Sequence, residues 1–128
     1  MNDRNPGGTR PFEYAVLRIV PRVDRGEFVN GAVLLYCQEA GYLGIRLRKD
    51  LDCVRALWAE SDVDAIGAAL ADAARVATDG APGLGDAGQR FRWLTAPRSV
   101  VVQPGPVHTG VTDDPEAELD RVAARMLG

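Results

Sequence analysis

The alternation of apolar and polar residues predicts three β-strands in the first part of the chain. Segments 12–21 (FEYAVLRIVP), 28–37 (FVNGAVLLYC) and 42–48 (YLGIRLR) are rich in aliphatic and aromatic residues whose side chains alternate between two faces. Pro21 ends the first segment, and residues 38–41 (QEAG) predict a hairpin turn between the second and the third. We therefore expect an antiparallel meander, with the first strand central because both of its faces are largely apolar.

A helical period replaces the strand period in the rest of the chain. Apolar residues recur three and four positions apart within segments 50–58, 61–80 and 115–127. Each segment opens with or follows a residue whose side chain can cap a helix: Asp50, Ser61 and Asp114. The apolar stripe of the helix at 61–80 is alanine-rich, so this helix should pack closely against its neighbour. A short β segment is expected at 99–103, where the surrounding prolines restrict it to the edge of the sheet.

The length and composition indicate a single globular domain. The chain has 128 residues, of which 46% are hydrophobic and 26% charged, which is ordinary for one such domain. Residues 1–11 are rich in Gly, Pro, Asn and Arg, and we expect them to form a disordered lead-in. Residues 12–128 are expected to form one α+β domain, an antiparallel β meander with the helices packed on one face.

Charge and cysteine content exclude several classes of protein. The net charge of −3 argues against a nucleic-acid module built on bulk positive charge. No run approaches the roughly 20 apolar residues that span a bilayer, and the polar start of the chain is not a signal peptide, so we expect a cytoplasmic protein. Cys37 and Cys53 form no CxxC pair or Cys/His cluster, and no metal or cofactor is indicated.

The least periodic segment, between residues 90 and 112, holds the strongest candidates for a binding site. Long irregular segments in small domains are often functional. This one supplies Arg90, Arg92, Trp93, Thr95, Arg98, Ser99 and His108. Guanidinium groups with hydroxyls suit a phosphate-bearing ligand, and an aromatic ring can stack on a base. In the alternative interpretation, Phe91, Trp93 and Leu94 cover the core while the arginines bond to loop carbonyls.

His108 is the only histidine, so it is a candidate general base as well as a candidate structural residue. Ser99, His108 and Asp113 could be drawn as a nucleophilic triad, but no nucleophile elbow surrounds Ser99. The acidic residues at helix starts are explained by the helix dipole.

A second candidate cluster lies at the opening of the second strand. Arg18 shares a face of the first strand with apolar residues and needs a partner there, because a lone buried charge is costly. Glu27 is the nearest carboxylate in the following loop, and Asn30 interrupts an apolar run. These residues form either a structural Arg–Glu pair or the floor of a polar pocket, with the segment from Arg90 to His108 as its lid.

Three stretches of the chain together resemble a bacterial family catalogued as domain of unknown function 3037, DUF3037. They are YAVLRIVPRVDRGEFVNGAVLLYC, QRFRWLTAPRSVVVQPGPVHTG and DDPEAELDRVAARML, within residues 12–127. The family's VNVGV-like run stands here as Val29–Val33 with the glycine shifted by one. The resemblance implies no established activity. Its genes often neighbour that of a HipA-like kinase, which implies a partner protein. Its distinctive polar positions correspond to Arg18, Arg25, Glu27, Asn30, Arg90, Trp93, Thr95, Arg98, Ser99 and His108.

Three hypotheses of function follow. The leading one is a non-enzymatic interaction or regulatory module that partners a HipA-like kinase and binds a phosphate-bearing ligand. The second is a small enzyme acting on a nucleotide or nucleic acid, with His108 as general base and Arg98 stabilising negative charge. The third, a nucleic-acid binder with Trp93 as stacking platform, is disfavoured by the charge balance.

Overall fold

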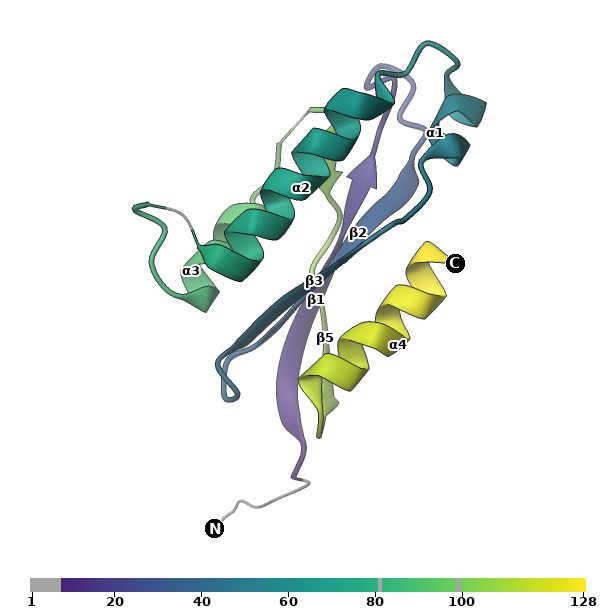
Figure 1. Ribbon diagram of the computed structural model, residues 1–128. Helices are drawn as coiled ribbons and strands as arrows, with labels where there is room; N and C mark the ends of the chain where they lie inside the picture. Colours follow the sequence, from purple (N-terminus) through teal and green to yellow (C-terminus); the bar gives the residue numbers. More distant parts are fainter. Residues whose placement is uncertain (1–7, 81, 99) are drawn as a thin grey trace.

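The computed structural model describes residues 8–80, 82–98 and 100–128. Three strands come first: β1 (Arg10–Ile19), β2 (Val29–Cys37) and β3 (Tyr42–Leu47). Three helices follow: α1 (Asp52–Leu57), α2 (Val63–Asp79) and α3 (Ala87–Leu94). The chain continues with β4 (Val102–Pro104), β5 (His108–Thr112) and α4 (Pro115–Leu127). Figure 1 shows α2 and α4 lying on either side of the sheet.

The strands form one antiparallel sheet in the order β3-β2-β1-β4, with β5 also paired to β1. β5 pairs with β1 from Arg10 to Tyr14 and β4 pairs with it from Leu17 to Ile19, so both lie along the edge of β1 that β2 leaves free. They are two halves of one edge strand, interrupted at residues 105–107. The predicted meander with a central first strand is confirmed, and the prolines lie at the sheet edge as expected.

β2 contains a bulge at Gly31, the glycine that is shifted by one position relative to the VNVGV-like run. Leu17 pairs with Ala32, but the next residue, Arg18, pairs with Asn30. Gly31 is the extra residue. A Cβ at this position would lie 2.8 Å from the Ile19 side chain, which explains why a glycine occupies it.

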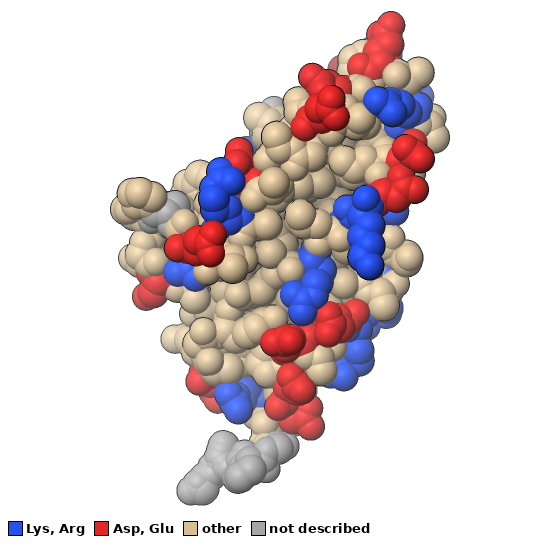
Figure 2. Space-filling view, viewed as in Figure 1, with Lys and Arg blue, Asp and Glu red and all other residues tan. Residues whose placement is uncertain are grey.

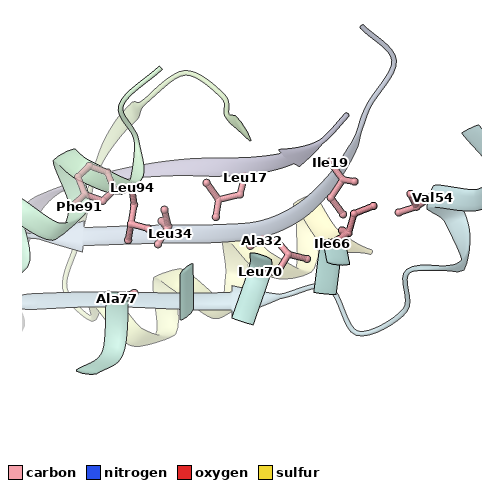
Figure 3. Close-up of a cluster of buried hydrophobic side chains, with 10 residues drawn as sticks. All are labelled: Leu17, Ile19, Ala32, Leu34, Val54, Ile66, Leu70, Ala77, Phe91 and Leu94. Carbon is pink, nitrogen blue, oxygen red and sulfur yellow. The ribbon is translucent and has the colours of Figure 1, made fainter. Parts of the chain in front are cut away.

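The sheet buries a separate apolar cluster on each side. Alternation along β1 sends Leu17 and Ile19 to one side and Phe12 and Val16 to the other. The first cluster packs against α1, α2 and α3 and is drawn in Figure 3. The second packs against α4 through Leu119 and Val122. We call these the α2/α3 side and the α4 side.

The α+β class is confirmed, but the expectation that all helices share one face is corrected. Because β1 and β2 are apolar on both faces, each face needs a cover. α4 provides it on the far side, where a Cβ on Gly44 of β3 would come within 2.7 Å of Leu119.

The N-caps of two helices lie one residue away from the predicted positions. α2 is capped by Asp62, which accepts from the Ala65 amide, whereas Ser61 donates to the Trp58 carbonyl. Asp50 accepts from the Asp52 amide but lies one residue before the N-cap of α1. α4 matches its prediction, with Asp114 as N-cap.

Most of the expected lead-in, residues 1–7, lies outside the described residues. Its last two residues, Arg10 and Pro11, belong to β1. Within the described ranges, each helix is too short or too polar to cross a membrane.

Candidate functional site

The residues predicted to form one pocket lie on two sides of the sheet. The α4 side carries Arg18, Asn30 and His108. The α2/α3 side carries Arg90, Trp93, Thr95 and Arg98. Glu27 lies in the loop between β1 and β2, and Ser99 lies outside the described residues. The structure therefore does not bring the two sequence clusters together into a single pocket.

Asn30 on the α4 side is held in a network of backbone hydrogen bonds. Its Nδ2 donates to the Met126 carbonyl in the last turn of α4, at 3.0 Å. Its own carbonyl accepts from Nε of Arg48, at 2.7 Å. The side chain thus satisfies a carbonyl that the helix end leaves unpaired. This arrangement fastens α4 to β2 and accounts for an amide in an apolar strand.

Arg18 does not pair with Glu27 as expected. Its guanidinium lies over the Phe28 ring, 4.3 Å from the ring centroid, and against Gly105, where a Cβ would be 3.0 Å from Nε. Glu27 instead pairs with Arg25 at 3.0 Å, and both side chains are exposed. A cation–π contact therefore takes the place of the ion pair in the structural alternative.

His108 is exposed on β5 and stacks on Tyr14, with 5.0 Å between ring centroids. Tyr14 belongs to the α4-side cluster, whereas Arg98 lies on the α2/α3 side. The enzymatic hypothesis needs His108 and Arg98 at one reacting centre, and the described geometry does not assemble that pair. No group of three or more His, Cys, Asp or Glu within the described ranges is placed to hold a metal ion.

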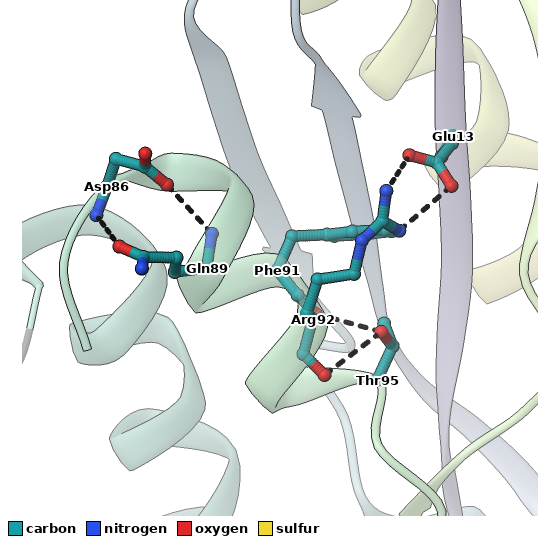
Figure 4. Close-up of polar contacts among 6 residues, drawn as sticks. All are labelled: Glu13, Asp86, Gln89, Phe91, Arg92 and Thr95. Atoms are coloured by element: carbon teal, nitrogen blue, oxygen red, sulfur yellow. Dashed lines mark hydrogen bonds and ion pairs between the residues drawn. The ribbon is translucent and has the colours of Figure 1, made fainter.

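Two of the arginines expected to bind phosphate are bonded within the domain. Arg90 donates to the carbonyls of Gly85 and Ala77, at 3.1 and 3.3 Å, and so ties the end of α2 to α3. Arg92 makes a two-pronged pair with Glu13, with both N–O distances 2.9 Å (Figure 4). Hydrogen bonding to Glu13 raises the pKa of Arg92 above its ordinary value. These guanidinium groups serve as structural ties.

Arg98 is held in the same way, at the end of the segment that follows α3. It donates to the carbonyls of Trp93 and Ala96, and its guanidinium lies 4.8 Å from the centroid of the Trp93 ring. Thr95 caps the end of α3 by donating to the Phe91 carbonyl at 2.8 Å. The alternative interpretation, in which the arginines bond to carbonyls, therefore describes Arg90 and Arg98. Phe91 and Leu94 are buried as that interpretation requires, but Trp93 is exposed.

The sequence did not predict an open groove of about 610 Å³ on the α2/α3 side. One wall is the flank of α2, and the other is formed by β4 with Arg98, Val100 and Val101. Trp58 and Trp93 also line the groove. Its lining is mostly apolar, with Glu60, Asp62, Asp72 and Arg98 as its charged members. We call it the α2–β4 groove.

Exposed large apolar side chains gather around this groove. Trp58 is 37% exposed, Trp93 45%, Val100 51% and Val101 38%, and all four line it. Isolated exposed apolar residues are ordinary, whereas several around one groove are more typical of an interaction surface. The signal in the sequence was the run of alanines on α2. Ala65, Ala69 and Ala73 line the groove together with the buried Ile66, whereas Leu70 packs in the core and does not line it.

The hollow on the α4 side has a different character. It measures about 420 Å³ and lies between α4 and the end of β3. Half of its lining residues are charged: Arg46, Arg48, Lys49, Asp50 and Asp120. Arg46 and Asp120 pair with each other at 2.9 Å. Over the face shown in Figure 2, acidic and basic side chains are interspersed, without a large patch of one sign.

Comparison with known proteins identifies the family but no activity. A family model described as "Protein of unknown function (DUF3037)" matches residues 14–127. No curated protein matches the chain, and no solved structure does.

Proposed function

The chain belongs to the DUF3037 family, whose function is unknown, and we propose that it is a non-enzymatic protein-interaction module that docks a partner in the α2–β4 groove. The observation that carries this proposal is the gathering of Trp58, Trp93, Val100 and Val101 around one apolar groove. Exposed tryptophans are typical anchors of protein interfaces, because their large apolar surface is removed from water on binding.

The energetics of burial favour a partner over solvent at this surface. Burying apolar area contributes roughly 25 cal/mol per Å². Burying a fully exposed large side chain contributes about 1.5–3 kcal/mol, and covering the exposed part of each of these four side chains contributes a fraction of that. Four partly exposed large side chains together supply enough apolar surface for the centre of a small interface. The arginines nearby do not offset this character, since their guanidinium groups are bonded within the domain.

The first partner to test is a HipA-like kinase. Support for this choice comes from the family resemblance and not from the groove itself. The phosphate-bearing ligand expected from Arg90, Arg92 and Arg98 has weaker support, because a ligand would have to displace the carbonyl or Glu13 contacts of these residues.

The test uses two matched substitutions on exposed helical alanines. Ala69 lines the α2–β4 groove and Ala124 lines the hollow beside α4. Glutamine at either position is a good helix former, so the fold should be retained. A69Q places a neutral, polar obstacle in the groove, and A124Q places the same group on the opposite side.

Binding to the purified kinase would be measured by calorimetry. We expect a complex at micromolar concentration, about tenfold weaker binding for A69Q (about 1.4 kcal/mol), and unchanged binding for A124Q. Loss of binding in A124Q alone would move the docking surface to the α4 side. No complex at micromolar concentration would count against this partner.

A further inference from the structure

We infer that the segment held by the α2–β4 groove is an amphipathic α-helix of the partner, with basic residues at the end that lies beside Glu60 and Asp62. This inference rests on the proposed function, since it specifies what the same groove recognises. It is carried by the shape of the groove, by the composition of its walls and by the placement of its charges.

The sheet edge beside the groove is poorly suited to an added strand. β4 has three residues, and the edge strand is interrupted between Pro104 and His108. Pro104 has no backbone N–H to donate to a neighbouring strand. Backbone groups on either side of β4 are already bonded to the first strand and the residue after it. The Gly105 N–H donates to the Val16 carbonyl, and the Val101 carbonyl accepts from the Val20 N–H. A partner strand would find too few free backbone groups to form a ladder.

The opposite wall is suited to a helix. The flank of α2 presents Ala65, Ala69 and Ala73 at intervals of four residues, which form a low ridge along the helix. Small side chains allow a second helix to approach to about 8 Å between axes. The lining of α2 runs from Asp62 to Val76. This corresponds to about 21 Å of helix, so a matching segment has about 14 residues.

The charges differ between the two ends of the groove. Glu60 and Asp62 lie at the start of α2, near Ile66, while Trp93 and Arg98 lie at the α3 end, near Leu94. Figure 3 shows Ile66 and Leu94 at opposite ends of the cluster beneath. In the part of the chain that the structure describes, neither Glu60 nor Asp62 forms an ion pair, whereas Asp72 pairs with Arg75. The acidic end therefore favours cations on the partner, and Trp58 beside it can stack on one.

The experiment uses three synthetic peptides of about 14 residues, built from leucine with lysine or glutamate. The first places leucines at helical spacing with lysines at one end and on the polar face. The second has the same composition with leucine and lysine alternating, as in a strand. The third keeps the helical spacing but replaces lysine by glutamate. None contains tryptophan, and both tryptophans of the protein line the groove, so tryptophan emission reports binding there.

We expect the first peptide to shift the tryptophan emission to shorter wavelength, and the other two to bind at least about tenfold more weakly. A69Q should weaken binding of the first peptide by about tenfold, and E60Q should weaken it by several-fold. A124Q should leave the affinity for this peptide unchanged. If the alternating peptide binds as tightly as the first, the bound segment need not be helical and the inference is rejected. If the glutamate peptide binds as tightly, the groove has no preference for basic residues and that part of the inference is rejected. Equal binding by A69Q would place the peptide elsewhere.

Two further outcomes separate this inference from the proposed function. If the kinase binds in an A69Q-sensitive manner while no peptide does, the docking surface stands and the amphipathic helix is rejected. If sedimentation shows that the free protein forms a dimer that A69Q dissociates, the occupant is a second copy of the chain, and the inference is overturned.

Discussion

The two sides of the sheet are built from the same strands but are covered in different ways. On the α4 side, one helix closes over Phe12, Val16, Val33 and Leu35, and its end is fastened by Asn30. On the α2/α3 side, three helices cover a larger cluster but leave the α2–β4 groove open. Polar side chains form structural bonds on both sides, but the second side also leaves apolar side chains exposed around a groove.

This difference shows where function is to be sought in the molecule. A conspicuous polar residue is explained once its hydrogen bonds are found, as for Asn30 and Arg98. Several large apolar side chains left exposed around one groove are not accounted for in this way, because burying them in the fold would be more favourable than leaving them in water. This contrast is the reason for proposing the α2/α3 side, and not the α4 side, as the docking surface.

The largest losses of stability are expected when a buried side chain is truncated on either side of the sheet. Phe91→Ala on the α2/α3 side should lower the free energy of unfolding by about 3–5 kcal/mol, and Leu119→Ala on the α4 side by about 2–5 kcal/mol. Both side chains are fully buried, so each substitution leaves a cavity. Urea denaturation followed by circular dichroism measures both. A loss below about 1 kcal/mol for either variant would mean that its helix is not packed as described.

A smaller effect tests the polar fastening of α4. Asn30→Ala leaves the Met126 carbonyl without this donor, and should cost about 1–3 kcal/mol. Partner binding by the folded variant should equal that of the wild type. Weakened binding at unchanged stability would instead make Asn30 part of an interface.

The cap of α3 should contribute still less. Asp86 and Gln89 form a capping box, each side chain bonding to the backbone amide of the other (Figure 4). Asp86→Ala should cost about 1 kcal/mol, with Asp62→Ala at the start of α2 as a comparison of similar size. Thermal melts would show both. A variant at residue 86 as stable as the wild type would indicate that packing alone holds α3.

The smallest effect is expected for the pair that links α3 to β1. Arg92 and Glu13 pair at 2.9 Å, but the Arg92 side chain is largely exposed. A double-mutant cycle with Arg92→Ala and Glu13→Ala should give a coupling of about 0.2–1 kcal/mol that decreases with added salt. A salt-insensitive coupling well above this range would show that the pair is shielded from solvent.

The sequence predicted the periodic elements well. The first three strands, α2 and α4 have long apolar patterns, and the structure confirms them, although α2 is capped by Asp62 and not by Ser61. α3 was missed because its eight residues include Gly88 and carry a short pattern. The capping pair Asp86 and Gln89 was the available signal.

The site was harder to predict, for a geometric reason. Ala69 and Leu70 are neighbours in sequence, yet Ala69 lines the groove and Leu70 is buried in the core. Successive helical residues point about 100° apart, so the pattern marks α2 as apolar without showing which flank stays uncovered. The hydrogen bonds of the polar candidates were hard to foresee for a related reason. The partner of Asn30, the Met126 carbonyl, is distant in sequence.

The most direct test of the account is nuclear magnetic resonance of the labelled protein titrated with its unlabelled partner. We predict that the indole N–H signals of Trp58 and Trp93, with the amides around Ala69 and Val101, shift or broaden first. Signals of α4 and of His108 should stay in place. Changes confined to α4 and β5, with both indole signals unaffected, would contradict the assignment of the α2–β4 groove as the docking surface.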